Sequence, residues 1–582
     1  MKLPASTTLP VIAALTRTAH ALNEPSSQFI LNEPSSQLIL NEPSSPVMPV
    51  KLASGTIVGR SHLGIDTFNG IPYADPPVGP LRLKPPQKLS RNLGTLDATG
   101  TAPTCPQMPI PDETRNAIQR VSSALLDFPF FQVPDPQQED CLTVSVQRSS
   151  GTKPDAKLPV LVWIYGGAFQ LGSTNGYDAS SLLNEAAGDG LPFVYVAINY
   201  RVGGFGFMPG VEILRDGSAN LGLLDQRMAI EWVAENIGHF GGDPDKVTLW
   251  GESAGSASVF DQMALYGGKT TYNSKPLFRG AIMDSGSVMP SDPVDCPQGQ
   301  AIYDAVVQKA GCAGKSDTLS CLRALDYQTF YNAATSVPAW LSFYSGALSY
   351  LPRPDGVVLP LSPERLIASR RYHAVPMIIG DQEDEGTLLS LFQQSLKTDD
   401  DLVDYFSELY FHNATKEQIR ELVDAYPSDF EGSPFGTGAA NILYPNFKRI
   451  SAILGDLTFT LTRRKFLELT SEANPKVPAW SYLSSYNRGQ PYLGTYHASD
   501  IFQVFNGPVR TYATQSCRRY YFDFLYDMDP NKGKGGYANW PLWKEARELM
   551  WFKTQCGNGY LKDDFRSSAY EVINRLGDVL RL

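Results

Sequence analysis

The chain has 582 residues, a mass of 63.9 kDa and a net charge of −11, with a sequence pI of about 5.2. Because 42% of the residues are hydrophobic and 19% are charged, the chain can bury a large core. An acidic chain without a run of Lys and Arg argues against a nucleic-acid partner. No stretch approaches the roughly 18 uninterrupted apolar residues that a transmembrane helix needs, so we predict a globular protein with no transmembrane segment.

The N-terminus has the features of an export signal. Lys2 supplies a positive start, Leu9–Leu15 is a short apolar run, and Ala19–Ala21 fits a small-x-small cleavage site. We therefore predict a signal peptide over residues 1–21 and a secreted protein. A second basic residue and several threonines interrupt the pattern, which leaves an intracellular protein as the alternative.

A nonapeptide repeat follows the predicted signal. Residues 22–48 contain three copies, LNEPSSQFI, LNEPSSQLI and LNEPSSPVM. Three short copies that contain Pro and Ser cannot bury a core of their own, so we predict a flexible extension over residues 22–48. No Pro/Gly/Ser-rich linker divides residues 49–582, which we interpret as a single domain with insertions.

This domain alternates between strand-like and helix-like segments. Leu158–Tyr165 and Phe193–Tyr200 are near-continuous apolar runs, and Leu221–Ile237 has the pattern of an amphipathic helix. Continuous apolarity is typical of strands that are covered on both faces. The alternation predicts an α/β fold with a large, mostly parallel central sheet flanked by helices. Further strands are expected at Val247–Trp250, Gly280–Met283 and Val375–Gly380.

The segment VTLWGESAGSASVF contains the only G-x-S-x-G pattern of the chain, from Gly251 to Gly255. A β-branched strand precedes the pattern, and small residues that can begin a closely packed helix follow it. This context predicts a strand–turn–helix in which Ser253 projects its hydroxyl as a nucleophile. Glycines on both sides of the serine remove side chains that would clash in so sharp a turn.

A serine nucleophile also needs main-chain N–H groups that face the developing oxyanion. One comes from the residue after the nucleophile, which is Ala254 here. The turn Gly166-Gly167-Ala168-Phe169 directly follows a predicted buried strand. We interpret this turn as the source of the other donors, in preference to an ordinary strand-to-helix connection.

The serine further needs a base, and the base needs an acid that fixes its tautomer. One of four acids after the strand Val375–Gly380 is expected to fill the acid role, and the other three are expected to be solvated at the surface. These four are Asp381, Glu383, Asp384 and Glu385.

The base is predicted from chain order. Around such an elbow the order is Ser, acid, His, and only two of the six histidines, His412 and His497, follow the acids. His412 lies beside the only N-glycosylation sequon, at Asn413, where a sugar requires an exposed surface. The prediction is therefore that His497 is the base and that Asn413 carries a glycan.

With these features the chain resembles the type-B carboxylesterases and lipases of the α/β-hydrolase fold, and most of all fungal lipases of the Candida rugosa and Geotrichum type. The resemblance covers nearly all of residues 50–582 and consists of many motifs in the family's order. Besides GHFGGDPDKVTLWGESAGS, they are FNGIPYADPPVGPLRLKPP, EDCLTVSV, NYRVGGFGF, FRGAIMDSGS and GDQEDEGT.

The resemblance implies a Ser-His-Glu triad made of Ser253, His497 and Glu385. The family's acid is the glutamate of a DEG triplet, which selects Glu385, and its base is the histidine of a GT-aromatic-H segment, which is His497. Ser285 matches a serine that supports the acid in this family. No metal or cofactor is implied, and the absence of any C-x-x-C pair argues against a zinc site.

The family pattern also implies oxyanion donors at Gly167, Ala168 and Ala254. The usual turn is Gly-Gly-Gly, so Ala168 is a departure. Alanine keeps the N–H group, and the hole is expected to survive where the backbone angles accept a β-carbon. We expect the extra methyl group to narrow the room for bulky acyl or alcohol groups.

The resemblance pairs four of the seven cysteines, as Cys105–Cys141 and Cys312–Cys321. The loop closed by the first pair, residues 105–141, resembles the family's lid. Its apolar face either packs on the body of the protein or covers the site in water and opens at a lipid surface, and we favour the lid. The face consists of Ile118, Val121, Leu125 and Phe128. No pairing follows for Cys296, Cys517 and Cys556.

The predicted function is hydrolysis of carboxylic esters through an acyl-enzyme, by a lipase or carboxylesterase that acts on small-molecule or lipid esters. One alternative is a specialised esterase or acyltransferase of a biosynthetic pathway. A non-catalytic adhesion module is a weaker alternative, because all three triad residues are present. Candidate cavity-lining residues, by proximity to the triad in sequence, are Phe169, Leu388 and Phe392.

Overall fold

The computed structural model describes residues 45–121, 136–427, 429–486, 488–506, 510–533, 535–553 and 557–582. The predicted signal peptide, most of the nonapeptide extension, two residues of the predicted lid face (Leu125 and Phe128) and Cys556 lie outside the described residues. No described helix is both long and apolar enough to cross a membrane.

The centre of the fold is a 12-stranded sheet in the order β1-β4-β5-β7-β9-β8-β10-β13-β14-β15-β16-β17. Its seven strands from β9 to β16 all pair in parallel, and antiparallel pairs extend it at both edges. The predicted mostly parallel sheet is therefore confirmed. The parallel strands are β9 (Val194–Ile198), β8 (Leu158–Ile164), β10 (Gly242–Glu252), β13 (Gly280–Asp284), β14 (Met377–Gln382), β15 (Ala479–Ser484) and β16 (Glu548–Phe552). The antiparallel strands are β1 (Ser45–Pro46), β4 (Arg60–His62), β5 (Ile65–Pro72), β7 (Thr143–Ser149) and β17 (Gly559–Lys562).

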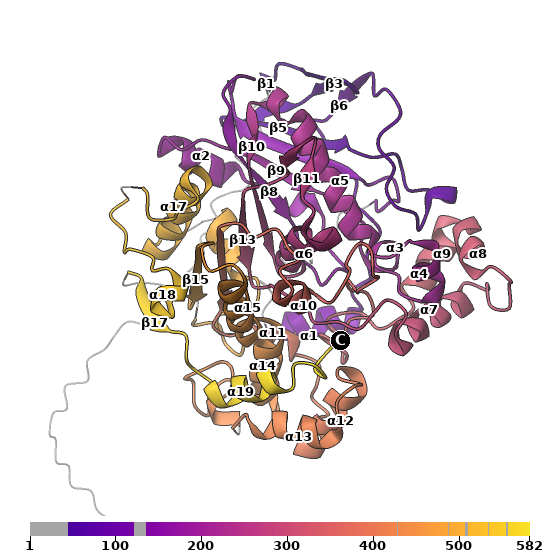
Figure 1. Ribbon diagram of the computed structural model, residues 1–582, viewed down its shortest axis with the longest axis vertical. Helices are drawn as coiled ribbons and strands as arrows, with labels where there is room; N and C mark the ends of the chain where they lie inside the picture. The colour runs from indigo at the N-terminus through magenta and orange to yellow at the C-terminus, as the bar shows by residue number, and fades with distance from the viewer. Residues whose placement is uncertain are drawn as a thin grey trace, which may run out of the picture. The chain divides into compact units, whose positions relative to one another are not determined.

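Helices cover both faces of this sheet (Figure 1). On one face, α2 (Ser180–Gly188) and α17 (Tyr512–Asp527) pack together. On the other, α5 (Leu221–Asn236) and α6 (Ala254–Gly268) pack against each other and on β10. Central strands buried on both faces explain the continuous apolar runs, since every residue of β9 and β13 is buried.

The first strand corrects the predicted domain boundary. Ser45–Pro46 lies inside the range 22–48 that the repeat predicted to be a flexible extension, yet it pairs antiparallel with β4. Val47, in the same copy of the repeat, is buried. The described end of the last copy, from Ser45 onward, is therefore part of the body, because its main-chain groups pair with an edge strand.

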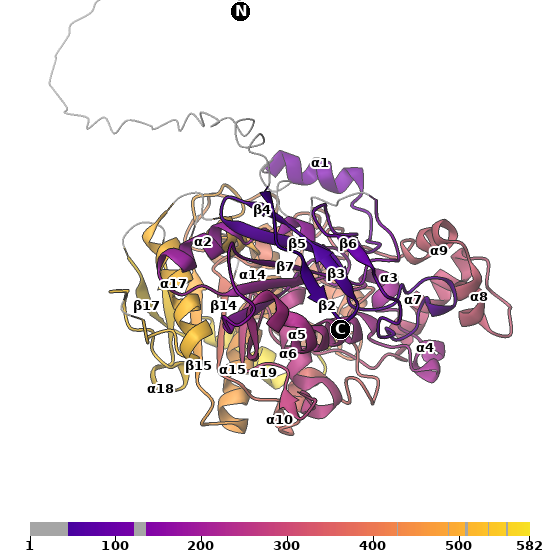
Figure 2. The same ribbon diagram turned by 90° about the horizontal axis from the view of Figure 1, so that it is seen from above.

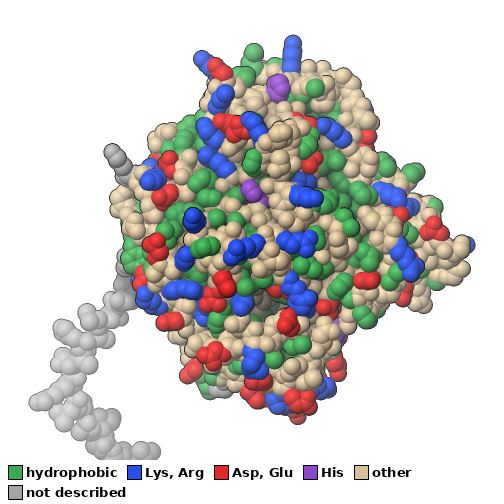
Figure 3. All heavy atoms as spheres, viewed as in Figure 1, with side chains coloured by type: hydrophobic (Ala, Val, Ile, Leu, Met, Phe, Trp, Pro, Cys, Tyr) green, Lys and Arg blue, Asp and Glu red, His purple; other side chains and the backbone are tan. Residues whose placement is uncertain are grey.

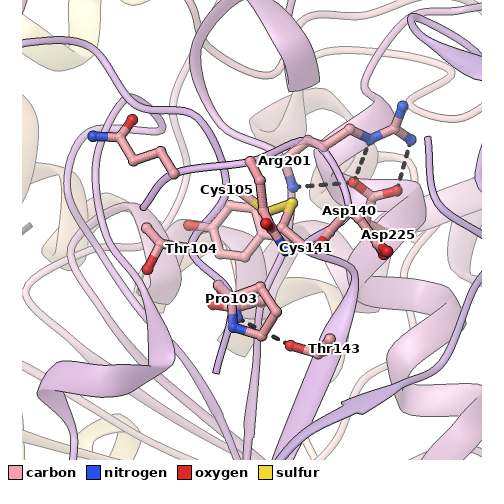
Figure 4. The surroundings of a disulfide bond; sticks show 12 residues. Pro103, Thr104, Cys105, Asp140, Cys141, Thr143, Arg201 and Asp225 are labelled. Carbon is pink, nitrogen blue, oxygen red and sulfur yellow. Dashed lines mark hydrogen bonds and ion pairs between the residues drawn. A yellow bond between two sulfur atoms is a disulfide. The ribbon is translucent and has the colours of Figure 1, made fainter. Parts of the chain in front are cut away.

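Both predicted disulfides are present. Cys105 and Cys141 are joined with a Cα–Cα distance of 5.1 Å, and Cys312 and Cys321 with 5.8 Å. Figure 4 shows the first bond beside the buried ion pair of Arg201 with Asp225, whose closest atoms are 2.7 Å apart. Among the described cysteines, Cys296 and Cys517 are free and buried.

On the face drawn in Figure 3, charges of both signs are mixed, and acidic side chains gather over α12 (Asp399–Leu409) and α13 (Lys416–Asp424). The acids of the first turn of α12 lie at the positive end of the helix dipole, which stabilises them. Thr398 and Asp401 form a capping box at the start of this helix.

Candidate active site

Ser253 occupies a sharp turn between β10 and α6, as the sequence predicts. Its backbone angles are φ 58° and ψ −125°, a conformation that costs energy for a residue with a side chain. The flanking glycines make the turn possible. A β-carbon on Gly255 would lie 2.0 Å from the carbonyl oxygen of Ile164, and one on Gly251 would lie 2.3 Å from that of Gly255.

The three predicted triad residues meet in the structure although they lie far apart in the chain. His497 Nε2 is 2.8 Å from Ser253 Oγ, and His497 Nδ1 is 2.6 Å from Glu385 Oε2. Because a carboxylate accepts, Nδ1 carries the proton and Nε2 is left to accept the serine hydroxyl. Both His497 and Glu385 are 1% exposed, so the serine hydroxyl is linked through hydrogen bonds to a buried imidazole–carboxylate pair.

Two further residues, Gln382 and Phe459, position the triad, and neither was identified from the sequence. The main-chain N–H of Gln382 donates to Glu385 Oε1 at 2.7 Å. The ring of Phe459 stacks on the ring of His497, with centroids 4.4 Å apart. Neither role has a signal in the sequence. Gln382 acts through its main chain, and Phe459 lies 38 positions before the histidine.

The other three acids, at the end of β14 and just after it, are not solvated, contrary to the sequence-based expectation. Asp384 is 1% exposed and accepts hydrogen bonds from Ser433 Oγ and from the main-chain N–H groups of Phe435 and Thr495. Burial raises the pKa of Asp384 to about 6. Since Thr495 lies two residues before His497, Asp384 anchors the loop that carries the histidine.

Asp381 is the second buried acid of this group. Its Oδ1 lies 3.3 Å from Nε of buried Arg463, and burial raises its pKa to about 7. Arg463 also forms an ion pair with Asp563 at 2.8 Å. Glu383 is half-buried and pairs with Arg488. The four acids are adjacent in the sequence but have different partners and roles in the structure, which only the tertiary contacts show.

The predicted oxyanion turn follows β8 and lies beside the serine. Ala168 and Ala254 line the same cavity as Ser253 and His497. Ala254 is the first residue of α6, where main-chain N–H groups have no partner within the helix. Ala168 has φ 56°, so its backbone is in the left-handed region, which costs a residue with a β-carbon roughly 1–2 kcal/mol. The turn accepts alanine, but under strain.

Ser285 does not support the acid in the way that the resemblance implies. Its hydroxyl is buried and has no hydrogen-bond partner in the described part of the chain. The acid is instead held by Gln382, as described above. Ser285 has φ 51°, and its main-chain N–H donates to the carbonyl oxygen of Gly380, so the residue is placed by its backbone.

The serine opens into a cavity of about 50 Å³ whose walls are mostly apolar. Phe169 lines it, as predicted, but Leu388 and Phe392 do not. Leu388 is fully buried and its neighbour Leu389 takes the place in the wall. The rest of the wall comes from Ala257, Gly286, Ser287, Met289, Trp340, Gly346, Leu348, Thr458, Phe459 and Leu582.

The predicted lid contributes one described helix, α1 (Asp112–Val121), which lies along the outside of the body in Figure 2. Of the two described residues of the predicted lid face, Ile118 is fully buried and Val121 is half-buried. Thr114 Oγ1 donates to the carbonyl oxygen of Leu341 at 2.9 Å. Since Trp340 lines the cavity, α1 touches the segment that forms the cavity wall.

The rejected histidine and the sequon lie at the surface. His412 and Asn413 are both exposed, and neither lines the cavity that holds Ser253. Asn413 Nδ2 donates to Asp292 at 2.7 Å. Across the described residues, no group of three or more His, Cys, Asp or Glu side chains is placed to hold a metal ion.

A serine at this elbow, bonded to a buried histidine–glutamate pair beside a mostly parallel sheet, defines the class of serine hydrolases with the α/β-hydrolase fold. The chain belongs to the carboxylesterase family, whose model matches residues 44–569. It is accordingly a carboxylic ester hydrolase.

Individual relatives agree with this membership. The chain is 58% identical, over 90% of its length and 89% of the relative's, to a secreted triacylglycerol lipase of Gibberella zeae. It is 42% identical to lipase 4 of Diutina (Candida) rugosa, over 90% of this chain and 95% of that protein. Among solved structures, EstA of Aspergillus niger superposes with a TM-score of 0.76 at 25% identity, over 92% of this chain and 99% of that one.

Proposed function

We propose that the protein is a secreted lipase that cleaves apolar carboxylic esters by two-step acyl transfer. The observation that carries the proposal is the continuous series of hydrogen bonds from Ser253 Oγ to His497 and on to Glu385, at 2.8 and 2.6 Å. A mostly apolar cavity beside the serine supports an apolar substrate. The names of the Gibberella and Diutina relatives support a lipase.

In the first step His497 Nε2 takes the proton of Ser253 as Oγ attacks the ester carbonyl. Glu385 keeps Nδ1 protonated, so the lone pair of Nε2 faces the serine, and it stabilises the imidazolium that forms. His497 then protonates the leaving alcohol, and an acyl-enzyme on Ser253 remains. Water repeats the sequence and releases the acid, so no metal or cofactor takes part.

In this proposal, the main-chain N–H groups of Gly167, Ala168 and Ala254 stabilise the negative charge that develops on the carbonyl oxygen. Two of these residues line the cavity beside Ser253. Loss of one such donor typically costs about 10²–10³ in rate. The strain at Ala168 supports this role, because strained backbone persists where the surrounding structure fixes it.

The lid assignment for residues 105–141 belongs to the same proposal. The disulfide fixes both ends of the loop, and α1 contacts the segment next to Trp340. Movement of α1 away from the body would expose apolar surface next to the cavity, which a lipid surface would stabilise. The signal over residues 1–21 and a glycan on Asn413 fit the secreted state named for the Gibberella relative.

The test is hydrolysis of p-nitrophenyl esters of increasing chain length by the wild type and by Ser253→Ala. We expect the variant to lose turnover while its circular dichroism stays unchanged. Ser258→Ala is the matched control, because Ser258 is a buried serine on α6, the helix that follows Ser253; it accepts a hydrogen bond from Gln226 and lies outside the cavity wall. Equal turnover by wild type and Ser253→Ala would overturn the proposal.

The lid is tested separately, with a medium-chain ester below and above its solubility limit. A working lid gives a jump in rate when an ester–water interface appears. Smooth saturation through the limit would leave an ester hydrolase without interfacial opening.

A further inference from the structure

A second cavity adjoins the one that holds Ser253, and the two share a wall. The first has a volume of about 50 Å³ and the second of about 300 Å³. Neither Ser253 nor His497 lines the second cavity, so it adds room and no second reactive centre. The residues that line both cavities are Met289, Gly346, Thr458 and Leu582.

The second cavity has an apolar interior and a charged rim. Buried side chains that line it include Val288, Phe411, Leu454 and Leu580. Exposed charged residues that line it are Arg365, Arg575 and Asp578. An interior of this kind is suited to an alkyl chain, which gains from leaving water. The cavity is therefore an extension that a long chain could occupy once its reacting carbonyl lies at Ser253.

The main chain of Leu582, one of the shared wall residues, is held by hydrogen bonds to residues far away in the sequence. Its main-chain N–H donates to the carbonyl oxygen of Pro290 at 3.1 Å, and its main-chain oxygen accepts from the N–H of Asp292 at 2.8 Å. The Nη1 of Arg353 donates to the same oxygen at 2.9 Å and to the carbonyl oxygen of Asp292 at 3.2 Å. Arg353 is buried and lines neither cavity, so it reaches the substrate space only through Leu582.

We propose that the Leu582 side chain is a partition that sets the longest alkyl chain the enzyme processes efficiently, and that Arg353 is a positioning residue that holds this partition. The proposal rests on the proposed function, since it concerns esters that react at Ser253. A smaller side chain at position 582 widens the connection between the two cavities, and a larger one blocks the passage from the first cavity into the second. The triad is untouched in both cases, so short esters react as before.

The experiment compares kcat/KM for p-nitrophenyl butyrate and p-nitrophenyl palmitate in Leu582→Ala and Leu582→Trp. Relative to the wild type, the palmitate-to-butyrate ratio is expected to rise about 10-fold in Leu582→Ala and to fall about 10-fold or more in Leu582→Trp, the range that a few methylene contacts supply. Val579→Ala is the matched control, because Val579 lies in the same segment, is partly buried and lines neither cavity.

Arg353→Met and Arg353→Lys separate positioning from general stability. Arg353→Met is expected to shift the ratio in the direction of Leu582→Ala, and Arg353→Lys, which keeps a donor, to restore it. A change in thermal stability with no change in the palmitate-to-butyrate ratio would show that Arg353 has no positioning role. An unchanged ratio in both Leu582 variants would overturn the partition while leaving ester hydrolysis intact. Failure of the wild type on every ester would instead overturn the proposed function.

Discussion

The two sides of the active centre are built in different ways. On the reactive side, Ser253 directly follows β10, Glu385 closely follows β14 and His497 lies on the loop after β15, so all three come from segments that follow strands of one sheet. On the substrate side, the wall comes from segments with no common origin. Trp340 lies after α9 (Tyr327–Ala334), Thr458 lies in η6 (Asp456–Thr460), and Leu582 closes the wall.

The difference shows how chemistry and substrate choice are separated in this molecule. Parallel pairing fixes the register of neighbouring strands, and the triad residues lie on the turn and loops that follow three of these strands. The wall has no such frame and depends on side-chain volume at each position. Changes on the reactive side should therefore abolish turnover of every ester, whereas changes in the wall should alter the ranking of esters.

The largest effect is expected for His497→Ala, which removes the proposed base. In comparable triads the loss of the histidine costs about 10⁶ in kcat, and we expect a similar loss for short and long esters alike. His412→Ala is the control, because His412 is exposed and outside the cavity wall. Kinetics on p-nitrophenyl butyrate, with thermal unfolding to check the fold, measure both. Retained turnover in His497→Ala would contradict the assignment of His497 as the base.

Glu385→Gln should cost about 10⁴ in kcat, because a neutral partner no longer fixes the histidine tautomer. The melting temperature should change little. Asp384→Asn is the contrasting variant, since Asp384 accepts hydrogen bonds from two main-chain N–H groups and a hydroxyl. It should lower the melting temperature and reduce kcat less than Glu385→Gln does. The reverse ranking in kcat would assign the acid role to Asp384.

On the substrate side, Trp340→Ala should alter selectivity. Trp340 is 7% exposed and lines the cavity, so its removal leaves space for branched or bulkier acyl groups. We expect the preference between a branched ester and its linear isomer to shift by about 10-fold, the scale of a pocket that gains a few methylene volumes. Loss of activity by the same factor on every ester would place Trp340 with the reactive side.

The smallest expected effect concerns stability. Asp261 lies on α6, the helix that begins after Ser253, and burial raises its pKa to about 8. The folded state thus keeps this proton between about pH 4 and pH 8, where the unfolded chain has released it. Stability is accordingly lost as the pH rises through that window.

Asp261→Asn removes this titration. Between pH 5 and pH 9, the free energy of unfolding should fall more in the wild type than in the variant, by more than about 1.4 kcal/mol, the equivalent of one pKa unit. Denaturant unfolding at the two pH values measures the difference. Parallel changes in both proteins would mean that Asp261 ionises in the folded state as it does in the unfolded chain.

Much of the reactive side could be predicted from sequence because it follows local rules. A strand, a tight turn with glycines on both sides and a helix of small residues are consecutive in the chain, so the Ser253 elbow is visible as a pattern. Chain order and elimination reduce the histidines to His497. The acid is less determined: buried strands predict where the acids lie, but only the family resemblance selects Glu385 from its neighbours.

The amino-acid sequence by itself determined the α/β architecture, the elbow and the order of the three proposed triad residues, because backbone geometry and hydrophobic periodicity act over short distances. Tertiary structure alone decided that Asp381 and Asp384 are buried and that Leu582 lines the cavity. These facts depend on contacts between segments up to hundreds of residues apart, such as Arg353 with Leu582. No local pattern records such contacts, since any side chain of suitable volume or charge could make them.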